Sequence, residues 1–291
     1  FMDKINLLLT GANGFIGKPL LKLIESKNIN ITVIGRTKPL NFKGSFFKVD
    51  IINDTDSKIC NILNKIKPTH LIHLAWYTEH GKFWDSEENT LWMIKSVSLI
   101  KKFCDSGGKN VIAAGSCAEY SWNSHQKLTE SSECKSTSLY GISKSRTRKL
   151  ITEVCNNSNV SITWCRIFFP YGPKDNANKL IPQLKKVARG LTEPFQIEQP
   201  GLRDFLHVED IAEAFLIIMK TNSIGIINIC SGVGHDLNEL MQKVLKNNLV
   251  NSSYKSNSHN NKNIINIVGD NTILLELGWK PRIDLYSYII E

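Results

Sequence analysis

The chain has 291 residues, 42% of them hydrophobic and 22% charged, a composition typical of a globular protein with a sizeable core. Its net charge of +9 comes from cations spread along the chain, which argues against a nucleic-acid partner and favours a small phosphate-bearing ligand. No apolar run approaches the roughly 18 residues of a bilayer span, and no charged-then-apolar leader follows Met2, so we expect a soluble, cytoplasmic protein without a membrane partner.

The first half of the chain alternates between strand and helix patterns. In chain order these predict a strand at 5–10, a helix at 14–27, strands at 31–35 and 45–50, a helix at 58–66, a strand at 70–75, a helix at 87–105, a strand at 110–115, a helix at 140–156 and a strand at 161–167. The apolar strands are typical of a sheet covered on both faces. Their βαβ spacing predicts the α/β class, as a Rossmann-like doubly wound parallel sheet.

The pattern becomes irregular after Pro170. It predicts a helix near 180–189, a short strand near 195–197 and an exposed Asn/Ser-rich loop at 247–263. We therefore expect a smaller mixed C-terminal lobe beside the domain that holds the parallel sheet. The expected division gives the Rossmann domain residues 2–169 plus about 206–231, and gives the lobe residues 170–205 and 232–291.

Cysteines and histidines offer no metal or disulfide signal. The seven cysteines are scattered and form no CxxC pair, which argues against a disulfide framework and a zinc site. His73, His207 and His235 show no ligand spacing, so no metal is expected.

A glycine-rich segment, "LLLTGANGFIG", follows the first predicted strand and opens the first helix. Glycines suit this turn because the backbone must approach a pyrophosphate closely, while the helix N-terminus offers it free N–H groups. Turns and close helix packing also use glycine, but the strand–loop–helix context favours a dinucleotide. The cofactor-binding residues predicted here are Thr10, Gly11, Asn13, Gly14, Phe15, Ile16 and Gly17.

The end of the second strand indicates which dinucleotide is bound. A carboxylate there would hold the ribose 2′-hydroxyl of NAD, but the segment reads "GRTK". Arg36 suits the 2′-phosphate of NADP, with Lys38 in support, so we expect NADP (NADPH) and consider NAD the weaker alternative. A surface arginine without a ligand is the other interpretation. Asp50 is expected to bond the adenine amino group, and Ile51, Leu74 and Ala75 complete the predicted cofactor set.

The segment "YGISK" places Tyr140 and Lys144 four residues apart at a predicted helix start. This spacing puts both side chains on one face of the helix, one turn apart. A tyrosine of pKa about 10 is a poor acid–base near neutrality, and a nearby ammonium favours its phenolate. The pair could therefore exchange a proton with a carbonyl oxygen. Chance occurrences of this spacing are common, but one downstream of a dinucleotide loop is a strong signal.

Six motifs occur in an order that resembles one family. They are "TGANGFIG", "HLIHLA", Tyr140-x-x-x-Lys144, "RIFFPYGP", "RDFLHVEDIA" and "LGWKP". Together they resemble the extended short-chain dehydrogenase/reductases of the NAD(P)-dependent epimerase/dehydratase family, which act on nucleotide-diphosphate sugars. The resemblance implies a catalytic hydroxyl at Ser116, four residues before Tyr120. It implies no role for Cys117, expected to pack or line the pocket, or for Glu119, expected to be a polar contact in the substrate cleft.

Departures from the family's patterns narrow the reaction. Ala118 stands where sugar 4,6-dehydratases carry a glutamate. Cys117 is one place early for the epimerase–reductases that make GDP-fucose, and Lys174 replaces their histidine. Arg36 replaces the strand-two acid of galactose-type 4-epimerases. What remains is NADPH-dependent reduction of the C4 ketone of a nucleotide-diphosphate 4-keto-6-deoxy sugar, in the synthesis of surface polysaccharide. The segments "GSCAEYSW" and "HLAWYTEHGKFW" are similar to segments of the dTDP-fucose and CDP-abequose reductases.

The resemblance also implies that the Rossmann domain binds the dinucleotide and that the C-terminal lobe is the substrate-binding lobe. Arg203 matches an arginine that contacts the nucleotide diphosphate, although a pair with Asp204 or Asp210 is the other interpretation. The loop from Trp76 to Trp84 should border the sugar, and Asn178, Lys179 and Leu180 fall where the family gathers base and phosphate contacts. Asn89 matches a family asparagine of unclear role. A homodimer is possible. An epimerase of the same family and a non-catalytic NADPH-binding regulator remain as alternatives.

Overall fold

A computed structural model describes residues 5–27, 29–122, 126–197, 199, 201–247 and 265–291. The loop predicted at 247–263 lies outside these residues, apart from Asn247 at its start, which ends a helix. None of the described helices combines the length and the apolar character that a membrane crossing requires.

The centre of the molecule is a seven-stranded parallel sheet in the order β10-β6-β5-β4-β1-β2-β3. Its strands are β1 (Asn6–Thr10), β2 (Asn30–Gly35), β3 (Ser45–Lys48), β4 (His70–His73), β5 (Asn110–Ser116), β6 (Ser161–Ile167) and β10 (Gly225–Ile229). This confirms the Rossmann-like α/β class. The strand β10 was not predicted, because its short apolar run follows a helix in the irregular half of the chain.

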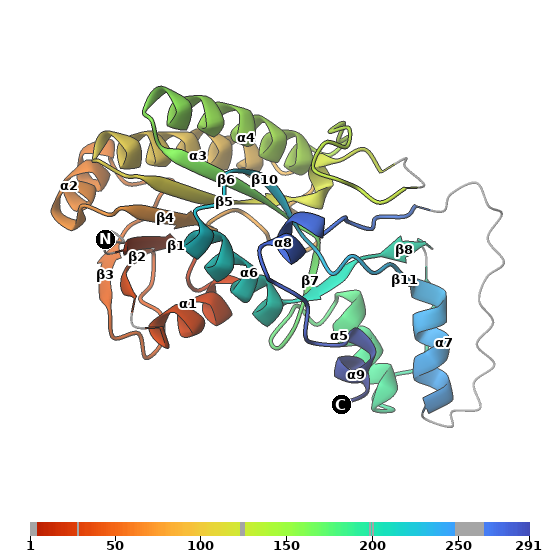
Figure 1. Ribbon diagram of the computed structural model, residues 1–291. Helices are drawn as coiled ribbons and strands as arrows, with labels where there is room; N and C mark the ends of the chain where they lie inside the picture. The colour runs from red at the N-terminus through yellow and green to blue at the C-terminus, as the bar shows by residue number, and fades with distance from the viewer. Residues whose placement is uncertain (1–4, 28, 123–125, 198, 200, 248–264) are drawn as a thin grey trace.

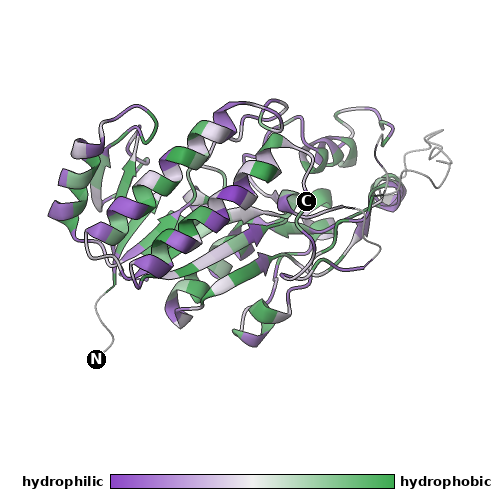
Figure 2. Cartoon of the chain, turned by 90° about the horizontal axis from the view of Figure 1, so that it is seen from above, coloured by the Kyte–Doolittle hydropathy of each residue, from purple (hydrophilic) through white to green (hydrophobic). Residues whose placement is uncertain are grey.

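Helices cover both faces of the sheet (Figure 1). On one face lie α1 (Gly17–Glu25) and α6 (Val208–Thr221), whose apolar side chains share a core with β1, β2 and β10. On the other lie α2 (Asp56–Ile66), α3 (Glu88–Asp105) and α4 (Leu139–Asn157), which share a second core with β3, β4 and β5. Burial of the strands between two helical layers explains their continuous apolar runs, and Figure 2 shows the hydrophobic residues gathered along them.

The remaining elements lie beside the carboxyl ends of the strands. A third apolar cluster joins α5 (Leu180–Ala188), α7 (Leu237–Asn247) and α9 (Leu285–Ile290). Short strand pairs link this cluster to the sheet layer: β7 (Phe169–Tyr171) with β9 (Phe205–His207), and β8 (Leu202–Arg203) with β11 (His235–Asp236). The element α8 (Thr272–Glu276) packs near β10. The division into two domains stays a prediction.

The strand predicted near 195–197 is wrong. This segment has no strand conformation, and Ile197 is buried in the cluster of α5, α7 and α9. Its apolar residues are explained by packing against helices, which requires no neighbouring strand.

The strand order reverses beside β1, because the chain continues to β2 and β3 on one side and returns to β4 on the other. In open parallel sheets such a reversal leaves a crevice at the carboxyl ends of the strands. The loops that follow β1, β4 and β5 all reach this crevice.

Candidate active site

A cleft of about 1940 Å³ lies at the carboxyl ends of the central strands, lined by these loops and by the start of α5. It brings together nearly all the site residues predicted from the sequence. Those lining it are Gly11, Asn13, Gly14, Phe15, Ile16, Gly17, Arg36, Asp50, Ile51, Leu74, Ala75, Trp76, Ser116, Tyr140, Lys144, Asn178 and Arg203.

The turn between β1 and α1 is built for close backbone approach. Gly11 has a φ of +73°, and a Cβ there would lie 2.8 Å from the backbone nitrogen of Ala75. The Gly14 N–H donates to the Gly11 carbonyl at 2.9 Å, which closes the turn. The helix α1 then begins at Gly17 without a side-chain cap from the described residues. This cradle and its open helix end fit a dinucleotide pyrophosphate.

Thr10, expected among the cofactor contacts, is fully buried behind this loop. Its Oγ1 lies 2.8 Å from His73 Nδ1 and accepts from the Ala75 N–H at 3.2 Å. His73 Nε2 lies 2.9 Å from Ser96 Oγ on α3. Burial, and then the charge of Lys144, lower the pKa of His73 to about 3, so this histidine is neutral. Thr10 thus ties the loop to β4.

The end of β2 presents a cation at the rim of the cleft. Arg36 is exposed and lines the cleft, whereas Lys38 is exposed without lining it. Asp50 accepts hydrogen bonds from the N–H groups of Ile52 and Asn53. Although burial raises the pKa of Asp50, hydrogen bonds from Asn53 and Ile52 and the charge of Arg36 hold it below its ordinary value. Arg36 and Asp50 are therefore neighbours at the expected adenosine end.

Ser116, Tyr140 and Lys144 meet at the floor of the cleft. Ser116 ends β5, and Tyr140 begins α4, whose first turn is capped by Ser138. The helix comes close because residue 141 is glycine, where a Cβ would lie 2.1 Å from the Ala118 carbonyl oxygen. Burial raises the pKa of Tyr140 well above its ordinary value, while a hydrogen bond with Ser116 acts to lower it.

Lys144 is buried in an unusual place for an ammonium. Its Nζ donates to the Ala114 carbonyl at 2.8 Å and lies 3.8 Å from the ring centroid of Trp76, against 5.9 Å from that of Tyr140. Burial lowers the pKa of Lys144 to about 7, although the charge of Glu119 raises it. The lysine therefore exchanges its proton close to neutral pH.

The segment after β4 forms an aromatic wall over Tyr140. The ring of Phe83 meets that of Tyr140 edge-on at 4.9 Å, and the ring of Trp84 does so at 5.8 Å. Trp122 continues the wall, 6.0 Å from Trp84. The Tyr140 N–H donates to the Trp84 carbonyl at 2.8 Å. This loop therefore fixes the start of α4 as well as bordering the cleft.

Asn89 holds this loop together, a role that the sequence left unclear. The residue is fully buried on α3. Its Oδ1 accepts from Trp76 Nε1 at 2.9 Å, and its Nδ2 donates to the carbonyls of Phe83 and Ser86 at 2.6 and 2.9 Å. The sequence offered one signal for this role, an asparagine near the start of the helix that follows an aromatic loop. Residue spacing alone does not predict which three groups this asparagine contacts.

The far side of the cleft carries Arg203, which is only 7% exposed. Its Nη1 donates to the carbonyls of Leu202 and Ile265. Asp204 instead accepts from the N–H groups of Ser231, Gly232 and Gly269, so the alternative that Arg203 pairs with Asp204 is wrong. Arg203 lines the cleft from β8, and Arg36 lines it from the end of β2.

The start of α5 also borders the cleft, close to the glycine-rich loop. Asn178, Lys179 and Leu180 all line the cleft. Lys179 pairs with Asp175 at 2.8 Å, and its Nζ lies 5.1 Å from the ring centroid of Phe15 in the glycine-rich loop. Among the described residues, no group of three or more His, Cys, Asp or Glu side chains could hold a metal ion.

The sequence profile of the NAD dependent epimerase/dehydratase family matches residues 7–230, most of the chain. The chain belongs to this family. The UDP-glucose 4-epimerase of Yersinia enterocolitica is 24% identical over 278 residues, covering 82% of this chain and 81% of that protein. The GDP-6-deoxy-D-talose 4-dehydrogenase of Aggregatibacter actinomycetemcomitans is 26% identical over 300 residues, covering 99% and 96%.

The fold of this family member also matches solved structures. The Bordetella bronchiseptica enzyme WbmG, solved in complex with NAD and UDP, superposes with a TM-score of 0.81 at 21% identity, covering 99% of this chain and 93% of that one. The expectation of an extended short-chain dehydrogenase/reductase is thereby confirmed.

Cys117 and Glu119 follow Ser116 closely in the chain and lie in different surroundings. Cys117 lines the cleft as expected, and burial raises the pKa of its thiol well above the ordinary value, so it stays protonated. The expectation that Glu119 is a cleft contact is wrong, because its side chain is fully buried and pairs with Arg166. Residues 117–119 form a short helical turn, and this turn directs the Glu119 side chain away from the cleft, towards Trp164 and Arg166 on β6.

Proposed function

We propose that this chain is an NADPH-dependent 4-ketoreductase of a nucleotide-diphosphate 4-keto-6-deoxy sugar, acting in the synthesis of deoxysugars for surface polysaccharide. The observation that carries the proposal is the make-up of the cleft floor. Ser116, Tyr140 and Lys144 meet there, while the two neighbours with acid–base groups, Cys117 and Glu119, are a protonated thiol and a buried, paired carboxylate. This set suits proton transfer to one oxygen.

The roles of the three groups follow from their chemistry. A dinucleotide held at the glycine-rich turn would supply the hydride for C4. Tyr140 holds the proton that the C4 oxygen takes up, and Ser116 donates a hydrogen bond that stabilises the charge developing on that oxygen. In its ammonium form, Lys144 stabilises the phenolate that is left on Tyr140. The pKa of Lys144, about 7, means that the ammonium form is present at and below neutral pH.

The cofactor preference rests on the end of β2. The glycine-rich turn serves either dinucleotide, and solved relatives such as WbmG bind NAD. Arg36 lies at the cleft rim beside Asp50, where a 2′-phosphate would find a cation. We therefore propose NADPH as the preferred reductant, with Thr10 acting only through the loop that it anchors.

The substrate class rests on the opposite side of the cleft. Arg203 and Asn178 both line the cleft, and a guanidinium held by backbone carbonyls suits a nucleotide diphosphate. The rings of Phe83, Trp84 and Trp122 give an apolar border beside Tyr140, which suits a sugar that lacks its 6-hydroxyl. The 4-dehydrogenase relative that acts on GDP-6-deoxy-D-talose by its name supports oxidation and reduction at C4.

A 4-epimerase is the second candidate, because several relatives carry that name and use the same fold. The two functions differ in what happens to the cofactor, which an epimerase regenerates within one turnover and a reductase consumes. A non-catalytic regulator is the weaker alternative, since the Tyr–Lys pair is intact and buried at the cleft.

The deciding experiment incubates the protein with NADPH and a panel of dTDP-, CDP- and GDP-linked 4-keto-6-deoxy sugars. We expect NADPH absorbance to fall with one member of the panel, and NMR of the product to show a new C4 hydroxyl. Parallel incubation of UDP-glucose with NAD⁺ tests the epimerase: formation of UDP-galactose without net formation of NADH would replace the reductase proposal. NADPH binding with neither reaction would favour the regulator.

A further inference from the structure

Glu119 is a carboxylate sealed beneath the catalytic groups. Its Oε1 accepts hydrogen bonds from the Ser116 N–H at 2.9 Å and from Trp164 Nε1 at 2.8 Å, and its Oε2 accepts from Arg166 Nε at 3.1 Å. Glu119 is 0% exposed, and the Arg166 side chain is 1% exposed. A buried charge persists only with such partners, so every part of this carboxylate is held in place.

The same residue fixes Ser116 from behind. Glu119 and Ser116 form a capping box around η1 (Cys117–Glu119): the carboxylate accepts the Ser116 N–H, and Ser116 Oγ accepts the Ala118 N–H at 3.2 Å. Because Oγ accepts from its own turn, its hydrogen is free to point towards the cleft and Tyr140. Glu119 thus determines where the Ser116 hydroxyl lies.

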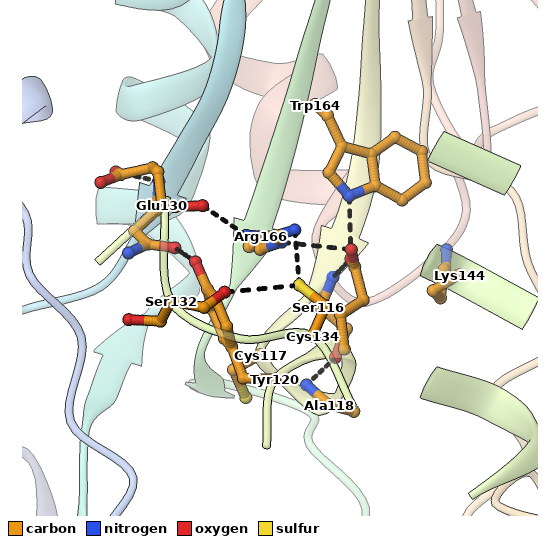
Figure 3. A network of polar contacts seen from close by, with 12 residues as sticks. Ser116, Cys117, Ala118, Tyr120, Glu130, Ser132, Cys134, Lys144, Trp164 and Arg166 are labelled. Carbon is orange, nitrogen blue, oxygen red and sulfur yellow. Dashed lines mark hydrogen bonds and ion pairs between the residues drawn. The ribbon is translucent and has the colours of Figure 1, made fainter. Parts of the chain in front are cut away.

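Arg166 keeps this carboxylate from turning into the cleft. Its Nη1 donates to the Glu130 carbonyl at 3.0 Å, and its Nη2 lies 2.9 Å from Cys134 Sγ. The guanidinium also stacks on the ring of Tyr120, 4.4 Å from its centroid. Figure 3 shows these contacts on one side of Ser116 and Trp164, with Lys144 on the other side. These contacts hold the Arg166 side chain in one position, and through the ion pair they also fix the Glu119 carboxylate.

Glu119 also supplies negative charge to the surroundings of Lys144. Titratable groups from three elements interact with Lys144 or lie close to it. They are Glu119 of η1, His73 of β4 and Tyr140 of α4. His73 is neutral, as its lowered pKa requires. Tyr140 is protonated, since burial raises its pKa. Lys144 Nζ lies 6.0 Å from the ring centroid of Trp164, and the Nε1 of this indole donates to Glu119. The carboxylate that pairs with Arg166 therefore lies beside the indole that borders the lysine, and its charge raises the pKa of Lys144 against the effect of burial.

We propose that Glu119, held by Arg166 and Trp164, is a positioning residue that sets the Ser116 hydroxyl against Tyr140 and supplies negative charge that favours the ammonium form of Lys144. The inference rests on the proposed function in taking these three residues as the reacting groups. Glu119 itself touches neither substrate nor cofactor, because its side chain lies outside the cleft lining.

The test compares Glu119→Gln with Tyr120→Phe in the full chain. The amide introduced by Glu119→Gln retains an acceptor for Ser116 and Trp164 but lacks the charge. Tyr120→Phe removes another buried hydrogen bond of the same network, from the Tyr120 hydroxyl to Asn228 at 2.7 Å, without touching Glu119. Lysine labelled at ¹³Cε and tyrosine labelled at ¹³Cζ report Lys144 and Tyr140 by NMR in the free protein, with Lys144→Met and Tyr140→Phe assigning the signals.

We expect Glu119→Gln to lower the titration midpoint of Lys144 by roughly one pH unit and to shift the Tyr140 signal. With substrate, kcat should fall about ten-fold at nearly constant KM, and the alkaline limb of the pH profile should move to lower pH. Tyr120→Phe should leave both midpoint and profile unchanged. Wild-type signals and profile in a folded Glu119→Gln protein would overturn the proposal.

Glu119→Gln leaves Arg166 buried without its counter-ion and could prevent folding. The double variant Glu119→Gln/Arg166→Met removes both charges together and should fold with the same lowered Lys144 midpoint; an unchanged midpoint there overturns the proposal. The two proposals fail separately. If no 4-keto sugar nucleotide oxidises NADPH, the reductase fails while the two NMR signals still decide the role of Glu119. If Glu119→Gln turns over normally and its Lys144 and Tyr140 signals are unchanged, the positioning role of Glu119 is wrong while the reductase proposal stands.

Discussion

The ammonium of Lys144 rests on the indole face of Trp76, 3.8 Å from the ring centroid, in a site from which nearly all water is excluded. Burial lowers the pKa of Lys144 to about 7, from an ordinary value of 10.5, and the cation–π contact only partly offsets the cost of burial. The active site therefore carries a lysine whose charge opposes folding.

Lys144→Met should abolish turnover and raise stability. Between pH 7 and 10.5 the unfolded chain binds the proton that the folded chain has lost, so Lys144 destabilises the fold fully below about pH 7 and less as pH rises. A pKa shift from 10.5 to about 7 corresponds to roughly 5 kcal/mol by linkage, and the lost hydrogen bond to the Ala114 carbonyl offsets part of this. We expect a gain of about 2–4 kcal/mol in the free energy of unfolding at neutral pH, disappearing above about pH 10.5. Urea unfolding across this range measures it, with the exposed Lys149→Met as control. Equal stability of the two variants at neutral pH would contradict the expectation.

Tyr140→Phe should abolish reduction while NADPH binding remains nearly intact, because only the hydroxyl that carries the proton is lost. Ser116→Ala should cost less, on the order of 10²-fold in kcat, as for one oxyanion-type donor. Steady-state rates and NADPH fluorescence titrations measure these effects. Cys117→Ala serves as the control and should be mild; a loss as large as that of Tyr140→Phe would make the thiol a catalyst.

Arg36→Asp should reverse the cofactor preference. A charge-assisted hydrogen bond contributes about 1.5–3 kcal/mol, so we expect NADPH to be preferred over NADH by roughly ten- to a hundred-fold in wild type. Lys38→Asp is the matched control, because Lys38 is exposed but does not line the cleft. The ratio of kcat/KM for the two reductants decides the question. Equal values in wild type would show that Arg36 does not bind a 2′-phosphate.

Arg203→Ala should raise KM for the sugar nucleotide more than it lowers kcat, if the guanidinium binds the diphosphate equally in ground and transition states. Arg203→Lys should recover part of the loss, since a point charge replaces a bidentate donor. KM for substrate and for NADPH are measured separately. An effect confined to the NADPH value would place Arg203 at the other ligand.

Asn89→Ala should loosen the aromatic loop. It removes the acceptor of Trp76 and the donor of the Phe83 and Ser86 carbonyls, which should cost about 1–3 kcal/mol in the free energy of unfolding. We expect faster tryptic cleavage at Lys82 within the loop and lower kcat. Asn89→Asp keeps the acceptor alone, so its cleavage rate should fall between those of wild type and Asn89→Ala. Unchanged cleavage in Asn89→Ala would mean that other contacts hold the loop.

Local contacts made the cofactor turn and the Tyr–Lys pair predictable. The glycines at 11, 14 and 17 need only one tight turn between a strand and a helix, and Tyr140 and Lys144 need only one helical turn. Because each of these motifs spans only a few residues, the cradle and the Tyr–Lys pair could be predicted from the sequence, and the spacing of the strands predicted the parallel sheet.

The surroundings of these groups became visible only in the folded chain. Glu119 was expected from its neighbours to be a cleft residue, but its partners Trp164 and Arg166 lie 45 and 47 residues further along the chain, on the adjacent strand. Thr10 was expected to contact the cofactor, but its hydroxyl is buried behind the loop and hydrogen-bonds with His73, which lies 63 residues further along the chain. Burial is set by which distant segments pack together, and local spacing carries no information about that packing. The same reason applies to Lys144, whose near-neutral pKa comes from the walls around it rather than from the helix on which it sits.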